Sequence, residues 1–205
     1  LFILIGTTLK AEDFEGFIKF HQYKANDTLI LTYSIKGQKI RINKHDKDGI
    51  PIQCLLVNIE KDKVTALNPK RNLYRPLNLK HKKGRTDKKK TQYQIIRRGN
   101  HKMINGVKCY QWRVRNRKNN SEIAYWVTKN NFNFFNEVFD LLESTNRIYH
   151  FFTEIPDNKG YFPMLSVERT LLRDERQRIA VVKIRKKPMR DQLFRIPDNY
   201  RMIKH

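Results

Sequence analysis

Hydrophobic and polar residues alternate over most of the chain, which is the pattern of half-buried β-strands. In residues 29–36, for example, Leu31 and Tyr33 lie on one face, and Thr32 and Ser34 lie on the other. Turn-forming residues separate these segments, and Asn105-Gly106 is the strongest such signal because both residues tolerate positive φ. The pattern predicts about eight to ten antiparallel strands, paired as consecutive neighbours, at residues 16–23, 29–36, 39–42, 50–59, 63–67, 92–98, 107–115, 122–128, 164–172 and 178–184.

A helical pattern interrupts the strands at residues 131–152. Apolar residues there recur at the three- and four-residue spacing of an amphipathic helix, from Phe135 to Phe152. Residues 144–146 (Ser-Thr-Asn) split this insertion into two candidate helices. The apolar residues at 194–200 are expected to close one edge of the sheet. The fold class is therefore mainly β (α+β), in a single domain over residues 12–205.

The chain is strongly basic, which points to an anionic partner or to a solvated basic surface. It has 205 residues, with 43 Lys and Arg against 20 Asp and Glu, and thus a formal net charge of +23. Residues 80–90 form the densest basic run and contain no apolar side chain, so we expect a surface loop there. No apolar run is long enough to span a membrane. Aromatic residues make up 11% of the chain, which favours a folded core over a disordered polycation.

The first eleven residues are apolar and are followed abruptly by Glu12 and Asp13. They are typical of the apolar and cleavage regions of a secretory signal peptide, and a short buried first strand is the alternative. We expect an exported protein, with residues 1–11 as the remnant of its signal. Cys54 and Cys109 are far apart in sequence. In an exported protein they are either a disulfide or two buried free thiols.

The chain contains none of the common sequence motifs of catalysis, so we expect that the protein is not an enzyme and binds no cofactor. There is no nucleotide-binding glycine loop, no nucleophile elbow around a serine and no pair of histidines at metal-ligand spacing. Nucleic acid is an improbable partner, although aromatic and basic residues alternate around Trp112. Alternation puts Tyr110 and Trp112 on one face of their strand and Arg113 and Arg115 on the other, so the aromatic face is expected to be core.

Five segments, in order along residues 12–202, resemble a family of uncharacterised Gram-negative envelope proteins that carries only a domain-of-unknown-function name. They are residues 14–20 (FEGFIKF), 33–42 (YSIKGQKIRI), 103–109 (MINGVKC), 123–128 (IAYWVT) and 194–200 (FRIPDNY). The fold of that family is similar to LolA and LolB, the carriers of outer-membrane lipoproteins. The resemblance implies a curled antiparallel sheet, an unclosed half-barrel whose concave face is covered by the helical insertion. It also implies export to the periplasm or the outer-membrane periphery, where the carriers shield acyl chains in an apolar hollow.

On this basis we expect a non-catalytic binding protein of the envelope, with lipid or lipoprotein acyl chains as the leading ligand. The alternatives are a basic module that binds an anionic polymer, either envelope polysaccharide or nucleic acid, and a structural protein without a small ligand. The candidate hollow is lined by Phe20, Tyr33, Ile35, Trp112, Trp126 and Phe139. The candidate anion-binding rim consists of Arg97, Arg98, Arg113 and Arg115.

Overall fold

The computed structural model describes residues 14–25, 27–77, 93–129, 132, 134–142 and 146–203. The predicted signal-peptide remnant and the basic loop at 80–90 lie outside the described residues. The described elements are β1 (Glu15–Lys24), β2 (Asp27–Lys36), β3 (Lys39–His45), β4 (Pro51–Asn58), β5 (Lys63–Asn68), β6 (Leu73–Leu77), β7 (Gln94–Ile104), β8 (Val107–Asn116), β9 (Ser121–Lys129), α1 (Phe134–Leu142), α2 (Arg147–Thr153), β10 (Tyr161–Arg169), β11 (Glu175–Lys186), a 3-10 turn (Asp191–Phe194) and β12 (Arg201–Met202).

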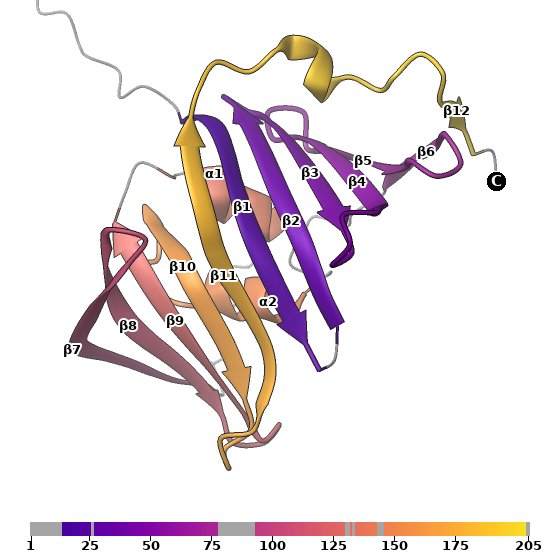
Figure 1. The fold of residues 1–205 in the computed structure, drawn as a ribbon. Helices are drawn as coiled ribbons and strands as arrows, with labels where there is room; N and C mark the ends of the chain where they lie inside the picture. The colour runs from indigo at the N-terminus through magenta and orange to yellow at the C-terminus, as the bar shows by residue number, and fades with distance from the viewer. Residues whose placement is uncertain are drawn as a thin grey trace, which may run out of the picture.

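All the described strands belong to one unclosed sheet, in the order β12-β6-β5-β4-β3-β2-β1-β11-β10-β9-β8-β7. Each pair of neighbours is antiparallel except β12 and β6, which run parallel. Pairing of β1 with β11 joins the two halves of the chain at the middle of the sheet (Figure 1). Gly16 is required at this junction, because a Cβ there would collide with the carbonyl oxygen of Arg185.

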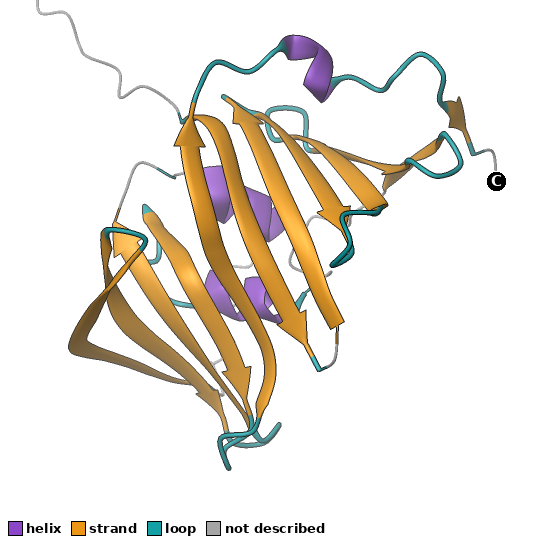
Figure 2. Ribbon diagram, in the orientation of Figure 1, coloured by secondary structure: helices purple, strands orange, loops and turns teal. Residues whose placement is uncertain are grey.

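The sheet curls around the two helices, which lie behind its central strands in Figure 2. The strands at both ends of the sheet recede from the viewer and β11 and β1 stand nearest, so the face seen in Figure 1 is convex. The predicted mainly β architecture, with a helical insertion on the concave side of an unclosed sheet, is confirmed. The predicted split of the insertion is also confirmed, since Asn146 is the N-cap of α2 and its side chain accepts a 2.9 Å hydrogen bond from the Ile148 amide.

Some strand boundaries differ from the expectations. Strand β10 covers Tyr161–Arg169 instead of residues 164–172, because residues 170–174 form the turn into β11. Strand β6 was not expected, since Arg75 and Pro76 interrupt its apolar pattern. It is held at the sheet edge by β12, which is only two residues long. The C-terminal apolar residues were expected to close an edge of the sheet; instead Ile196 and Tyr200 pack on a face of β4 and β5, and the pairing at the edge comes from the next residues, in β12.

Candidate functional site

The predicted hollow is filled by side chains over most of its area. Phe20, Tyr33, Ile35, Trp112 and Phe139 are all buried in the main core, as the sequence pattern indicates for inward-facing residues. Helix α1 fills the space between them: the ring of Phe135 lies 5.9 Å from that of Tyr33, 5.4 Å from that of Phe139 and 4.3 Å from that of Phe162, centroid to centroid. These aromatic residues therefore form the core under the helices.

Trp126 is half-buried and packs against this cluster, but it is not one of the buried residues that fill the hollow, so its assignment to the hollow was wrong. The buried residues of β9 are Ile123, Tyr125 and Val127, and strand alternation turns Trp126 to the opposite face. There the Lys102 ammonium lies 4.1 Å from the Trp126 ring centroid. Tyr110 was also expected in the core but is exposed, whereas its neighbour Cys109 is fully buried. The register of β7 and β8 shifts between Arg97 and His101, and the alternation of buried residues along β8 breaks beside that shift.

The four arginines of the predicted anion rim do not form one group. Arg113 and Arg115 both pair with Glu122, at 3.5 and 2.7 Å, on the face opposite the core. The Arg97 guanidinium lies over the Trp112 ring, 4.5 Å from its centroid, and donates to the carbonyl oxygen of Pro156. Arg98 is exposed. Since three of the four already have protein partners on two different faces, the rim as predicted was wrong.

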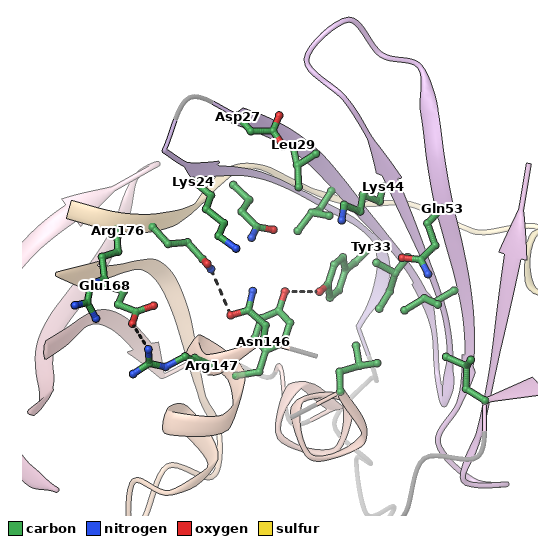
Figure 3. Close-up of a pocket in the computed structure, with 18 residues that line it drawn as sticks. Lys24, Asp27, Leu29, Tyr33, Lys44, Gln53, Asn146, Arg147, Glu168 and Arg176 are labelled. Atoms are coloured by element: carbon green, nitrogen blue, oxygen red, sulfur yellow. Dashed lines mark hydrogen bonds and ion pairs between the residues drawn. The ribbon is translucent and has the colours of Figure 1, made fainter. Parts of the chain in front are cut away.

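An open pocket of about 730 Å³ remains beside the helices, on the concave face of β1–β4 (Figure 3). Of the residues predicted for the hollow, only Tyr33 lines it. One wall is aliphatic and comes from the inward faces of β2, β3, β4 and β6 and from the end of α1. It consists of Leu29, Leu31, Ile42, Leu55, Leu77 and Leu142.

The other side of the pocket is polar and mostly cationic. Lys24, Lys44 and Arg176 stand around the mouth (Figure 3), and no described carboxylate forms an ion pair with any of the three. Among the described residues, Asp27 and Glu168 are the acidic members of the lining. The pocket therefore joins an aliphatic wall to a mouth with an excess of positive charge.

Hydrogen bonds fix the side of the pocket that α2 contributes. The side-chain amide of Gln177 donates to Asn146 Oδ1 at 3.3 Å, so the N-cap of α2 is tied to β11. The guanidinium of Arg147 lies 3.3 Å from Glu168 Oε1, and that same buried oxygen accepts from the Ser121 hydroxyl at 3.2 Å. These contacts hold the start of α2 against β9, β10 and β11.

Two tyrosines form the deepest part of the pocket, where the open space meets the core. The hydroxyl oxygens of Tyr33 and Tyr149 are 2.9 Å apart. Burial, and next to it the interaction with Tyr149, raises the pKa of Tyr33 well above its usual value. Burial also raises the pKa of Tyr149, against a smaller lowering by its hydrogen bond to Tyr33. Both phenols are therefore neutral at physiological pH, and their paired hydroxyls close the floor without a charge.

The described lining of the pocket is made of aliphatic, amide, phenol and charged side chains. Among the described residues that line it, none is Ser, Cys or His. Among the described residues, no three His, Cys, Asp or Glu are grouped so that they could hold a metal ion. Cys54 and Cys109 are free and buried, as in one of the two predicted alternatives, and burial raises the pKa of Cys54 to about 11. No helix among the described residues is long and apolar enough to cross a membrane.

The pocket residues were missed because the prediction favoured large aromatic side chains. A usable signal was present in β2, where Leu29 and Leu31 alternate in register with Tyr33. The cationic mouth carried no comparable signal. It combines Lys24, Lys44, Arg147 and Arg176, which come from β1, β3, α2 and β11 and meet only through the sheet topology.

Fold and pocket together define a half-barrel domain with an open, amphipathic concave site. The model of the domain of unknown function DUF4412 matches residues 14–200, and the chain belongs to that family. The predicted membership of a domain-of-unknown-function family is thus confirmed. No match was found among the curated proteins.

Several solved structures are similar to the chain. An uncharacterised conserved protein from Thermus thermophilus has a TM-score of 0.56 at 8% identity, over 93% of this chain and 91% of that one, which shows a shared fold. MucB from Pseudomonas aeruginosa, solved with MucA, gives 0.49 at 10% identity, over 93% of this chain and 58% of its own. A domain from Vibrio parahaemolyticus described as an outer membrane lipoprotein-sorting protein gives 0.37 at 8% identity, over 90% of each chain.

Proposed function

We propose that this domain is a non-catalytic binding protein that takes up one lipid-like amphiphile in the concave pocket. The single observation that carries the proposal is the junction of an aliphatic wall with a cationic mouth in one open space of about 730 Å³. Such a space has the size of a typical small-molecule site. The ligand places an acyl chain along Leu29, Leu31 and Leu55 and an anionic head group near Lys44 and Arg176.

The energetics of this arrangement require both parts of the pocket. Ten buried methylene groups contribute roughly 8 kcal/mol, at ~0.8 kcal/mol each. Association removes several kcal/mol of that through lost translational and rotational freedom, at least about 4 kcal/mol. Contacts between the head group and the cations at the mouth supply the remainder that a micromolar affinity needs. A ligand with a chain but no charge would therefore bind more weakly than its anionic counterpart.

The setting we propose is the periplasm or the outer-membrane periphery of a Gram-negative cell. The apolar residues 1–11, which are typical of a signal peptide, support this assignment. Acyl chains of lipids or lipoproteins are the amphiphiles available there.

A fluorescence titration with cis-parinaric acid, a naturally fluorescent fatty acid, tests the proposal. Leu55→Trp places a bulky side chain in the open space and is expected to weaken binding at least about tenfold, as ~1.4 kcal/mol or more of apolar contact is displaced. Ile52→Trp is the matched control, because Ile52 lies on the same strand, is 39% exposed and does not line the pocket.

The proposal is supported if Leu55→Trp alone weakens binding while both variants keep the thermal stability of the wild type. Equal affinity of all three proteins would place the fatty acid elsewhere on the molecule. Absence of saturable binding to the wild type would leave the domain without the proposed activity.

A further inference from the structure

The convex face of the sheet carries a group of cations that the pocket does not use. On β11, residues Lys183 and Arg185 are exposed, and Lys187 directly follows the strand. On β1, Lys19 is directly opposite Lys183 in the strand register, and Phe17 is opposite Arg185. Directly opposed residues of an antiparallel pair project from the same face of a sheet. We name Lys19, Lys183, Arg185 and Lys187 the crest cluster.

The crest cluster lies on the face opposite the core and the pocket. The buried residues Ile18 and Phe20 flank Lys19 on β1 and point to the concave side, so Lys19 points to the convex side. The register shifts between Lys19 and Phe20, where Val182 of β11 has no partner on β1. That residue is 38% exposed, although it is apolar and lies in a central strand. Strands β11 and β1 are the ones that stand nearest the viewer in Figure 1, at the crest of the curled sheet.

Neighbouring cations on the same sheet are neutralised, whereas the crest cluster is not. Arg178 pairs with Glu175 at 2.8 Å, and Lys36 pairs with Asp191 at 3.2 Å. Among the described residues, no carboxylate forms an ion pair with any member of the crest cluster. Lys187 contacts an aromatic ring instead, with its ammonium 5.4 Å from the Phe17 centroid.

Such an arrangement is unfavourable for the isolated protein. Like charges directly opposite each other on neighbouring strands destabilise a sheet, and Lys19 and Lys183 are such a pair. Residues two apart on a strand are about 7 Å from each other, so the four charges lie within roughly one or two Debye lengths at physiological salt. An anionic surface placed over the crest relieves this repulsion.

From this geometry we infer that the crest cluster docks the domain onto an anionic phospholipid bilayer. On the convex face, Lys36 of β2 and Arg41 of β3 donate to carbonyl oxygens of the C-terminal segment, whereas Lys183 and Arg185 of the crest are exposed and open to contact with a flat surface. Exposed Val182 lies among the cations, as suits the boundary between head groups and acyl chains. A single-stranded polyanion fits less well, because its backbone follows a basic groove and its bases stack on exposed aromatic rings. The crest offers neither, since the ring of Phe17 is covered by Lys187.

The inference is independent of the proposed function, since the two sites lie on opposite faces of the sheet. Binding at the crest leaves the concave pocket turned away from the bilayer. A variant of the crest cluster is therefore expected to bind cis-parinaric acid as the wild type does, and Leu55→Trp is expected to bind vesicles as the wild type does. A result that contradicts ligand binding in the pocket can thus be distinguished from one that contradicts vesicle binding at the crest.

Vesicle flotation of the full chain tests the inference, with vesicles of phosphatidylcholine alone and of equal parts phosphatidylcholine and phosphatidylglycerol. The wild type is expected to float only with the acidic vesicles. Lys19→Glu/Lys183→Glu is expected to reduce the partition coefficient about 30-fold or more, which corresponds to ~1 kcal/mol for each basic residue near the surface. Lys61→Glu/Lys70→Glu is the matched control, because it changes the net charge equally in exposed turns away from the crest. Its partition coefficient is expected to stay within about threefold of the wild type.

Three outcomes would overturn the inference. The wild type fails to bind acidic vesicles, the two double variants lose binding equally, or a single-stranded oligonucleotide binds more tightly than the vesicles with the same dependence on Lys19 and Lys183. Lys19→Gln/Lys183→Gln guards against a folding defect, since it removes the charges without reversing them. It is expected to retain the thermal transition of the wild type and to show a smaller loss of vesicle binding in the same direction.

Discussion

The two halves of the concave face are built differently. Under α1 and α2, the sheet is covered by aromatic side chains such as Phe135 and Phe162, both fully buried. Beside the helices, the same sheet surface is aliphatic and open, with Leu29 and Leu55 only half-buried. Large aromatic residues on the inner face therefore mark where the helices pack. The site lies where the sheet carries smaller side chains and the helices leave part of its inner face uncovered, and the predictions below test that division.

The largest expected effect is a loss of folding stability when an aromatic residue under the helices is removed. Phe135→Ala removes a fully buried ring that lies within 6.3 Å, centroid to centroid, of the rings of Phe20, Tyr33, Phe132 and Phe139. It should lower the free energy of unfolding by about 3–5 kcal/mol. Leu29→Ala, in the open half, should cost only about 1 kcal/mol, because that side chain is partly exposed already. Urea denaturation of both variants makes the comparison, and equal costs would contradict the division.

The second effect concerns pH and the tyrosines at the border of the two halves. Burial raises the pKa values of Tyr33 and Tyr149 in the folded state above about 10, the value expected when the chain is unfolded. The folded state then binds more protons than the unfolded state, so this contribution to stability is complete below about pH 10 and is lost as the pH rises above it. Each tyrosine contributes a slope of about 1.4 kcal/mol per pH unit in that range.

The comparison of wild type with Tyr33→Phe/Tyr149→Phe isolates this contribution from the titration of the many lysines. The variant should lose stability less steeply above about pH 10, by up to about 2.7 kcal/mol per pH unit. Urea denaturation between about pH 8 and about pH 11 measures the two slopes. Parallel curves for the two proteins would show that the phenols are not held neutral by the fold.

A smaller effect is expected at the mouth of the pocket. Lys44→Glu/Arg176→Glu should weaken the binding of a fatty acid about tenfold, or ~1.4 kcal/mol, because two cations near the head group are reversed. The affinity for the corresponding fatty alcohol should change less than about twofold, since that ligand carries no charge. Isothermal titration of the wild type and the variant with both ligands measures the loss of affinity for the acid and for the alcohol. An equal loss for acid and alcohol would mean that these residues shape the pocket without selecting its ligand.

The smallest effect is expected on the convex side. Arg113→Gln/Arg115→Gln removes two ion pairs to Glu122 in which the side chains are 19–30% exposed. The cost in stability should be about 1 kcal/mol or less. The affinity for cis-parinaric acid should not change, because neither arginine lines the pocket. A clear loss of affinity in the same titration would show that these two arginines take part in ligand binding, contrary to their position in the structure.

The strand pattern predicted most of the fold because it depends on local alternation. Strands β1–β5 and β7–β11 were all expected, and so was the split of the helical segment at Asn146. Pairing of β6 with β12 escaped prediction because it is a two-residue parallel contact between distant parts of the chain. Trp126 was assigned to the wrong face because its size was given more weight than the strand alternation. That alternation turns the side chains of Tyr125 and Trp126 to opposite faces of β9.

Less of the candidate site was predictable, for a physical reason. Whether an inward-facing residue is core or pocket depends on which helix covers it, and alternation carries no such information. Tyr33 and Phe20 have the same pattern in sequence, yet only Tyr33 reaches the open space. Likewise, Arg113 and Arg115 are neutralised by Glu122 on the next strand. The sequence pattern does not show this pairing, so both arginines were predicted to be available to an anionic ligand.

Photo-crosslinking with a fatty acid that carries a diazirine at the end of its chain tests the central claim most directly. The labelled peptides of the full chain are identified by mass spectrometry, with unlabelled fatty acid as competitor. The account predicts competed labels on the aliphatic wall, on β2, β4 or the end of α1. Competed labels confined to the convex face, or none that the competitor removes, would contradict it.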